Sequence, residues 1–325
     1  MLNLMEDFQI DTSIVLNKNI DIPITLLPKQ YIDGRILVNK KVRCSVQYGK
    51  RADKGGYGLI TRIKRLPSPA ELCVKSPHKS NASLCSEAIL QWYISRTLRA
   101  VNIHGAVPHV YDIFQYAGET RFTMDYINGI SAVQAVMEST DPDTLWLQIL
   151  GQVSLILGYL EENIYLDHRD LKADNLWIRK DPIDYTLKVG GHTWRIVAPF
   201  QVVILDFGFA CLGDPDGNAV ISLGAGLVPK IDPCPKEGRD LFQLIASMWS
   251  IPSIRERASS EMQSAIDSLL KNKGASFVGL VHQNLSTHWI YLAVSDSAFR
   301  HPPLHPIALL LKLSSGWPAI NLTQL

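Results

Sequence analysis

The sequence predicts an α+β protein of about two domains. Its 325 residues are long for a single domain, and an apolar fraction of 46% is ample for a large packed core. Two apolar runs over residues 107–116 and 119–127 have the length and composition of strands. A later run over residues 142–163 repeats its apolar positions at helical spacing, so strands and a long helix follow one another along the chain.

The charge balance and the lack of long apolar runs argue against several classes of partner. The 32 Lys and Arg nearly equal the 31 Asp and Glu, so net charge gives no reason to expect nucleic acid or a membrane surface as partner. Residues 1–30 contain acids early and no uninterrupted apolar segment of the length that a signal peptide needs, and we therefore expect no signal peptide. No run approaches the ~20 apolar residues that a membrane helix needs.

Cysteine usage predicts the cellular compartment. The 5 cysteines are scattered, form no C-x-x-C pair and are odd in number. This pattern favours reduced thiols over a disulfide framework, so we expect an intracellular protein of the cytoplasm or nucleus.

Residues 1–42 show no sustained period. They mix short apolar runs with Asp, Asn and Pro. We interpret them as an extension that lies on the first domain, with a partly ordered tail as the alternative.

The most informative stretch is residues 166–178, where an acid, a lysine and an amide lie between apolar residues. Asp170, Lys172 and Asn175 fall within six residues of one another. The stretch has the form H-R-D-L-x-x-x-N at every specified position, and Asp206-Phe207-Gly208 follows an apolar run later in the chain. In these motifs the sequence resembles a eukaryotic-type Ser/Thr protein kinase, of a divergent kind with haspin-like or viral-type affiliation.

This resemblance implies a fold. We expect a bilobal protein kinase-like architecture, with a small antiparallel β-sheet lobe of five strands plus one helix, and a larger, mainly helical lobe. The expected boundaries are 1–42 for the N-terminal extension, 43–127 for the first lobe and 128–325 for the second. If the source is viral, the compartment is that of the host cell.

The resemblance also implies a role for each polar residue of the central stretch. Asp170 would accept or orient the proton of the substrate hydroxyl, and Lys172 would contact the γ-phosphate. Asn175 and Asp206 would bind Mg²⁺, with Mn²⁺ as the alternative ion. Lysine at position 172 is typical of Ser/Thr protein kinases, so ATP is the expected phosphate donor and a protein hydroxyl the expected acceptor.

Residues 53–60 resemble the glycine-rich loop that covers the ATP phosphates. They align with G-x-G-x-x-G-x-V if Asp53 occupies the first glycine position. An ordinary hairpin turn is the alternative interpretation of these glycines. The residues of this segment that we expect at the nucleotide are Gly55, Gly56, Tyr57, Gly58 and Ile60.

Lys75 is expected to pair with Glu87. Residues 72–75 resemble the V-A-I-K strand, with Cys73 in the alanine position and Lys75 as the residue that holds the α- and β-phosphates. Helical spacing over residues 81–99 places Glu87 on the apolar stripe of that helix. A carboxylate on the core side of a helix needs a partner, and the resemblance identifies Lys75 as that partner.

Residues 122–129 resemble the hinge of the same family. Met124 occupies the gatekeeper position, and the segment from Asp125 to Ile127 would offer backbone groups to adenine. The alternative is an ordinary strand end.

Two regions depart from the family pattern. Residues 183–199 predict an inserted β-hairpin with a Gly-Gly turn. Between Asp206 and Asp240 no Ala-Pro-Glu occurs, and Ser222 is the only hydroxyl residue. We therefore expect constitutive activity or control by a partner, and an unusual mode of substrate recognition. Asp240 itself occupies the family position that holds the catalytic loop.

Two other functions are compatible with these motifs. An ATP-binding pseudokinase scaffold would explain Asp53 at the first glycine position and the altered segment after Asp206. A small-molecule kinase of the aminoglycoside or choline type would agree with the missing Ala-Pro-Glu, whereas Arg169 and Lys172 favour a protein kinase. No oligomeric state is predicted.

Overall fold

The fold consists of two compact units with different secondary structure. The first comprises the described residues up to Ala100 together with Val107–Asn128, and the second comprises Val101–Ala106 and Gly129–Leu325. In the described residues, a sheet and one helix form the first unit and helices dominate the second, which confirms the predicted α+β class. The computed structural model describes residues 29–32, 34–38, 41–54, 58–66, 71–78, 83–223, 234–271, 275–283, 304–316 and 321–325.

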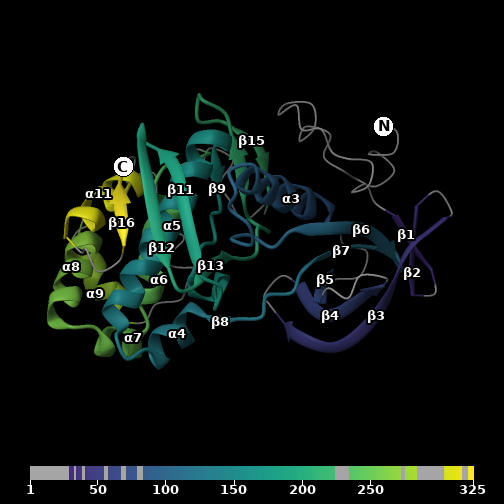
Figure 1. The fold of residues 1–325 in the computed structure, drawn as a ribbon, viewed down its shortest axis with the longest axis horizontal. Coiled ribbons are helices and arrows are strands. Elements are labelled where there is room, and N and C mark those ends of the chain that lie inside the picture. The colour runs from purple at the N-terminus through teal and green to yellow at the C-terminus, as the bar shows by residue number, and fades with distance from the viewer. Residues whose placement is uncertain are drawn as a thin grey trace. The chain divides into compact units, whose positions relative to one another are not determined.

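A sheet of seven strands forms the described part of the first unit (Figure 1). Its order is β1-β2-β3-β4-β5-β7-β6, with antiparallel neighbours, and a parallel pairing of β1 with β6 closes it into a barrel. The strands are β1 (Lys29–Ile32), β2 (Arg35–Val38), β3 (Lys41–Lys54), β4 (Gly58–Leu66), β5 (Glu71–Pro77), β6 (Val110–Tyr116) and β7 (Glu119–Asp125).

The expectation of five strands was wrong, because β1 and β2 lie within residues 1–42 and join the sheet. Ile36 of β2 is fully buried and packs in the same core cluster as Val46, Leu72 and Phe114. A strand of four residues offers too few positions for an alternating pattern to be recognised, which is why the sequence shows no period there.

The single helix of the described first unit is α3 (Cys85–Arg99). Its apolar stripe is buried as expected, and Glu87 is buried with Leu90, Ile94 and Leu98. The strands β6 and β7 are joined by Ala117 and Gly118, whose φ angles are both positive. Such a two-residue connection matches the right-handed twist of the strands it joins.

The second unit is built around a long buried helix, α5 (Pro142–Ile164). Its first turn has the predicted form, because the Asp141 side chain accepts a hydrogen bond from the Thr144 N–H and Pro142 occupies the first turn. Tyr165 ends the helix in the left-handed conformation. The other described helices are α4 (Ala132–Glu138), α6 (Arg239–Trp249), α7 (Pro252–Arg257), α8 (Ser260–Leu270), α9 (Ala275–His282) and α11 (Pro306–Gly316).

Three small sheets accompany these helices. The first contains β8 (Ile130–Ser131), β10 (Leu176–Arg179) and β13 (Gln201–Ile204), and the second contains β9 (Leu166–Asp167), β14 (Cys211–Gly213) and β15 (Ala219–Ser222). The third contains β11 (Ile183–Val189), β12 (His192–Ala198) and β16 (Leu322–Gln324).

A hairpin is present where residues 183–199 predict one. It packs on α5, and Gly158 allows a close approach, since a Cβ there would lie 2.7 Å from a methyl carbon of Val189. The sequence does not indicate that β16, near the end of the chain, pairs with β12.

The structure contradicts the expectation of reduced thiols throughout, because Cys211 and Cys234 form a disulfide. Their Cα atoms lie 6.4 Å apart, and both residues are buried. No spacing motif marks this pair, since the fold brings β14 beside the segment that precedes α6. Cys44, Cys73 and Cys85 are buried and take part in no disulfide.

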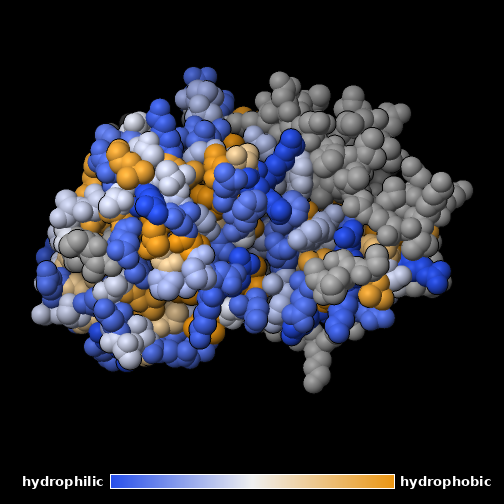
Figure 2. Space-filling view, in the orientation of Figure 1, coloured by the Kyte–Doolittle hydropathy of each residue, from blue (hydrophilic) through white to orange (hydrophobic). Residues whose placement is uncertain are grey.

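Surface hydropathy gives no single apolar patch on the face shown in Figure 2. Hydrophobic residues of the second unit are interspersed there with hydrophilic ones. None of the helices in the described part of the chain has both the length and the apolar character needed to cross a membrane.

Candidate functional site

In the first unit, the structure joins Lys75 of β5 to Glu87 of α3. The Lys75 Nζ lies 2.5 Å from Glu87 Oε1, and each side chain is only 6% exposed. Lys75 sits centrally in the sheet, paired with Ile60 on β4 and with Phe122 on β7. The Lys75 ammonium group is thus held in place by a buried carboxylate.

Gly58 lets β4 approach this lysine closely. A Cβ at Gly58 would lie 3.0 Å from Lys75 Cε and 3.1 Å from the Ser76 carbonyl oxygen, so a larger residue would displace the lysine stem. Ile60, also predicted at the nucleotide, is partly buried. The predicted residues Gly55, Gly56 and Tyr57 lie outside the described residues.

The strand end expected to act as a hinge is held by several contacts. Cys73 and Met124 are cross-strand neighbours, and the Cys73 thiol donates to the Asp125 carbonyl oxygen at 3.4 Å. The Asp125 N–H donates to the His109 carbonyl oxygen, and its carboxylate accepts from the Tyr111 hydroxyl at 2.7 Å. These contacts fix the direction of the Asp125 backbone.

Burial makes the Cys73 thiol unreactive at neutral pH. Desolvation raises the pKa of Cys73 to about 12, and the charge of Asp125 adds to this while that of Lys75 opposes it. Ile127, the last residue expected to offer backbone to adenine, has a buried side chain that is 8% exposed.

In the second unit, Asp170, Lys172 and Asn175 form one hydrogen-bonded group. Lys172 Nζ donates to Asp170 Oδ2 at 2.7 Å, and Asn175 Nδ2 lies 2.8 Å from the Asp170 backbone oxygen and 3.3 Å from Oδ2. The Asp170 and Lys172 side chains are 16% and 19% exposed. The carboxylate is thus fixed by two donors and still partly accessible.

The strand β13 brings Asp206 to the same loop. The Leu205 N–H donates to the Asn175 backbone oxygen at 2.9 Å, so the residue before Asp206 is bonded to Asn175. Asp206 has φ +63°, and its carboxylate accepts from the Gly208 N–H at 3.4 Å. A positive φ at a non-glycine residue is costly and is found preferentially at functional sites.

His168 is a structural residue of this loop. Burial lowers the pKa of His168 despite the nearby Asp170, so the ring is neutral near pH 7. Its Nδ1 accepts from the Asp170 N–H, and the Nε2 proton therefore goes to the Leu205 carbonyl oxygen at 2.9 Å. The ring also packs against Phe207 with centroids 4.8 Å apart. These contacts link Asp170 to the Asp206 segment.

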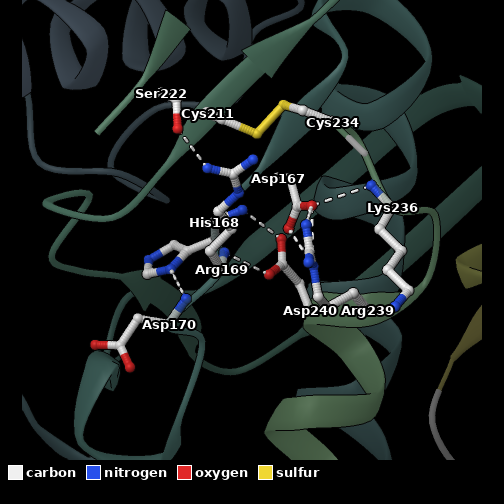
Figure 3. A network of polar contacts seen from close by, with 10 residues as sticks. All are labelled: Asp167, His168, Arg169, Asp170, Cys211, Ser222, Cys234, Lys236, Arg239 and Asp240. Carbon is white, nitrogen blue, oxygen red and sulfur yellow. Dashed lines mark hydrogen bonds and ion pairs between the residues drawn. A yellow bond between two sulfur atoms is a disulfide. The ribbon is translucent and has the colours of Figure 1, made fainter. Parts of the chain in front are cut away.

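The helix α6 holds the backbone of the loop (Figure 3). The Asp240 carboxylate accepts from the N–H of His168 at 2.6 Å and from the N–H of Arg169 at 2.8 Å. Ser247, two turns later, accepts from the Ala173 N–H at 3.0 Å. Asp240 was expected to hold the catalytic loop, whereas the contribution of Ser247 was not foreseen.

A buried ion pair that the sequence does not predict lies beside Asp240. Asp167 and Arg239 are bonded to each other, and the Lys236 N–H also donates to Asp167 at 3.0 Å. Asp167 is a charged residue in the short buried strand β9, directly after Leu166, and a charge in such a place is a signal that could have drawn attention to it. Its partner is 72 residues away, so no local pattern connects the two.

Arg169 reaches the only hydroxyl residue between Asp206 and Asp240. Its Nη1 donates to Ser222 Oγ at 2.6 Å, and Ser222 is exposed on β15. Arg169 itself is buried, with φ +64°.

Asn175 and Asp206 offer the hard oxygen ligands that suit Mg²⁺. Because Asn175 uses its Nδ2 for Asp170, its Oδ1 is the atom that can bind a cation. Mg²⁺ in phosphoryl-transfer sites is held by one or two protein ligands together with phosphate oxygens and water. No cluster of three or more His, Cys, Asp or Glu in the described residues could hold a metal ion by itself. Asn175 and Asp206 are thus the residues of this loop that could hold Mg²⁺ together with such oxygens.

Comparisons with known proteins give distant structural likenesses. No protein-family model matches the chain, and no curated protein matches it. The crystal structure of the BubR1 kinase domain is 14% identical with a TM-score of 0.47, covering 96% of each chain. The autoinhibited serine kinase domain of the giant muscle protein titin is 11% identical with a TM-score of 0.43, covering 82% of this chain and 78% of that one. At such identities and TM-scores, neither likeness bears on what the chain does.

Proposed function

We propose that the chain is a protein kinase that transfers the γ-phosphate of ATP to a Ser or Thr hydroxyl. The observation that carries this proposal is the bonded group of Asp170, Lys172 and Asn175, on a loop held by buried contacts. A fixed, accessible carboxylate beside a cation is the arrangement that phosphoryl transfer to a hydroxyl requires.

In the proposed reaction, the hydroxyl oxygen of the substrate forms a bond to the γ-phosphorus. The bond between that phosphorus and the bridging oxygen breaks, and ADP leaves. Asp170 orients the hydroxyl and takes its proton, while Lys172 contacts the γ-phosphate. Asn175 and Asp206 would hold Mg²⁺, which would neutralise phosphate charge when bound.

The residues of the first unit are assigned to the nucleotide. Lys75 binds the α- and β-phosphates, and Glu87 fixes the lysine through the buried ion pair. The backbone from Asp125 to Ile127 is assigned to adenine, with Met124 and Cys73 beside it.

The test is transfer of ³²P from [γ-³²P]ATP to an unbiased Ser/Thr peptide library in the presence of Mg²⁺. Asp170→Asn should lower the rate about 10²- to 10⁴-fold because it removes the proton acceptor. Lys75→Met should also abolish measurable transfer, because it removes the cation from the phosphates. The matched control is Asp174→Asn, an exposed acid of the same loop, which should retain wild-type activity.

The other possible outcomes contradict the proposal or favour a different function. Undiminished transfer in both Asp170→Asn and Lys75→Met would falsify the proposal. Mg-ATP binding without transfer to any acceptor would favour a pseudokinase scaffold. Phosphorylation of a metabolite panel but of no peptide would favour a small-molecule kinase.

A further inference from the structure

A buried ion pair joins the residue before His168 to the residue before Asp240 (Figure 3). The side chains of Asp167 and Arg239 are 2% and 0% exposed. Arg239 Nε lies 3.0 and 3.3 Å from the two carboxylate oxygens of Asp167, and Nη2 of the same guanidinium also bonds to Oδ2. The pair is therefore multiply bonded and removed from water.

Stability alone does not explain such a pair. Removing two charges from water costs free energy that their attraction barely offsets, and a hydrophobic pair of similar volume is often equally stable. A buried ion pair is more informative about geometry, because its bonds are directional.

Two consecutive residues of α6 hold three consecutive residues of the loop. Arg239 bonds to the Asp167 side chain, and Asp240 bonds to the N–H groups of His168 and Arg169. Arg169 has φ +64°, a conformation that costs on the order of 1 kcal/mol and persists only where the surroundings impose it. The backbone that leads into Asp170 therefore depends on both oxygens of Asp240.

Arg239 is attracted to both acids. Burial alone would raise the pKa of Asp167, but the charge and hydrogen bonds of Arg239, together with the charge of Arg169 and the Lys236 N–H, lower it. Burial and the charge of Asp167 raise the pKa of Asp240, and the charge of Arg239 opposes this. Figure 3 shows the guanidinium beside both carboxylates. Asp240 is thus the second acid to which Arg239 can bond.

We propose that Asp167 is a positioning residue for phosphoryl transfer. By binding Arg239, it leaves both oxygens of Asp240 for the N–H groups of His168 and Arg169, which fixes the backbone that carries Asp170. Without the charge of Asp167, Arg239 turns to Asp240 and competes with those two N–H groups. The effect of Asp167 on the rate of transfer rests on the proposed function, whereas its effect on the loop backbone does not depend on activity.

Asp167→Asn tests this directly, because it removes the charge and keeps the shape. At a temperature well below unfolding, kcat should fall about tenfold or more, since small displacements of catalytic groups are costly, while KM for ATP stays within about twofold. Exchange of the backbone amide hydrogens of residues 166–171 in the folded variant should become faster than in the wild type. The matched control is Asp112→Asn, which breaks the ion pair between buried Asp112 and partly exposed Arg65 in the other unit and should leave kcat and this exchange unchanged.

The double variant Asp167→Asn/Arg239→Gln separates competition from loss of the ion pair. It removes the competing cation as well, so kcat and exchange should return to within about threefold of wild type. This variant also decides the matter if the single variant does not fold. Two results would overturn the proposal. One is a folded double variant whose kcat is about tenfold or more below wild type and whose exchange is faster, as expected for Asp167→Asn alone. The other is a folded Asp167→Asn variant with wild-type kcat and exchange. If the wild type transfers no phosphate, the proposed function fails, and hydrogen exchange alone then decides the role of Asp167.

Discussion

Glu161 carries a carboxyl group in a place that disfavours its charge. The residue is 7% exposed on α5, and its Oε2 has no hydrogen-bond partner in the described part of the chain. Burial raises the pKa of Glu161 well above its usual 4.5, and the charges of Asp240 and Asp167 raise it further. The Gly238 N–H is a donor that opposes the shift. The group therefore stays protonated to a higher pH in the folded chain than in the unfolded chain.

Glu161→Gln is expected to stabilise the protein, and more so as pH rises. The folded wild type binds a proton at Glu161 that the unfolded chain loses near pH 4.5, so its stability falls as pH rises from 4.5 through the folded-state pKa. Glutamine cannot ionise, and its amide can donate to the neighbouring acids. We expect a gain of about 1 to 3 kcal/mol at pH 8, measured by urea unfolding.

The control for this prediction is the next residue along the chain. Glu162 is exposed, and its Oε1 accepts from the Gly190 N–H at 2.5 Å. Glu162→Gln should give no stability gain that grows with pH. A Glu161→Gln gain that is absent, or that does not change between pH 5 and pH 8, would contradict the assignment.

At the scale of elements, the disulfide joins β14 to the segment before α6. Cys211 pairs with Asp167 across β14 and β9, and Cys234 lies two residues before Lys236, whose N–H donates to Asp167. The bond therefore ties together two segments, 23 residues apart in sequence, that both contact Asp167, the residue proposed to position the loop. It holds both of these segments close to the loop that carries Asp170.

Reduction of this disulfide should lower stability. Closing a loop of this length restricts the unfolded chain and is worth about 3 kcal/mol. A dithiol that reduces the bond, or the double variant Cys211→Ala/Cys234→Ala, should lower Tm by several degrees, measured by calorimetry. The same dithiol should not change the Tm of the double variant. An equal effect of the dithiol on both proteins would argue against the bond.

At the scale of the whole molecule, the residues assigned to ATP and Mg²⁺ belong to two units that each have a core of their own. The first packs around residues such as Ile36, Leu72 and Phe114, and the second around α5. Ligand binding adds stability by mass action to whichever state binds the ligand. Thermal unfolding therefore reports nucleotide binding even where no transfer occurs.

Mg-ATP should raise the Tm of the wild-type protein. At about 100 times Kd the gain is roughly 2.7 kcal/mol, and it should shrink when EDTA removes the metal. Asp170→Asn should keep the full gain, because Asp170 acts on the hydroxyl, whereas Asp206→Asn should lose the part that depends on Mg²⁺. An equal metal-dependent gain in Asp206→Asn would contradict the assignment of Asp206.

Local features of this protein could be predicted from sequence because their causes are local. The Asp141 cap and Pro142 mark the start of α5, and helical spacing places Glu87 on the buried face of α3. The α+β class, the hairpin over residues 183–199 and the closeness of Asp170, Lys172 and Asn175 depend on neighbours in the chain. In these cases a few consecutive residues carry the whole signal.

Only the tertiary structure decided the pairings between distant segments. The bonds of Asp167 with Arg239 and of Cys211 with Cys234, and the pairing of β16 with β12, span 72, 23 and more than 100 residues. Each depends on which buried surfaces come together, and no local period or cap encodes that choice. The sequence by itself thus determined the order and type of the chemical groups around Asp170. Packing decided what holds them in place, because buried charges and thiols find their partners only when the core closes.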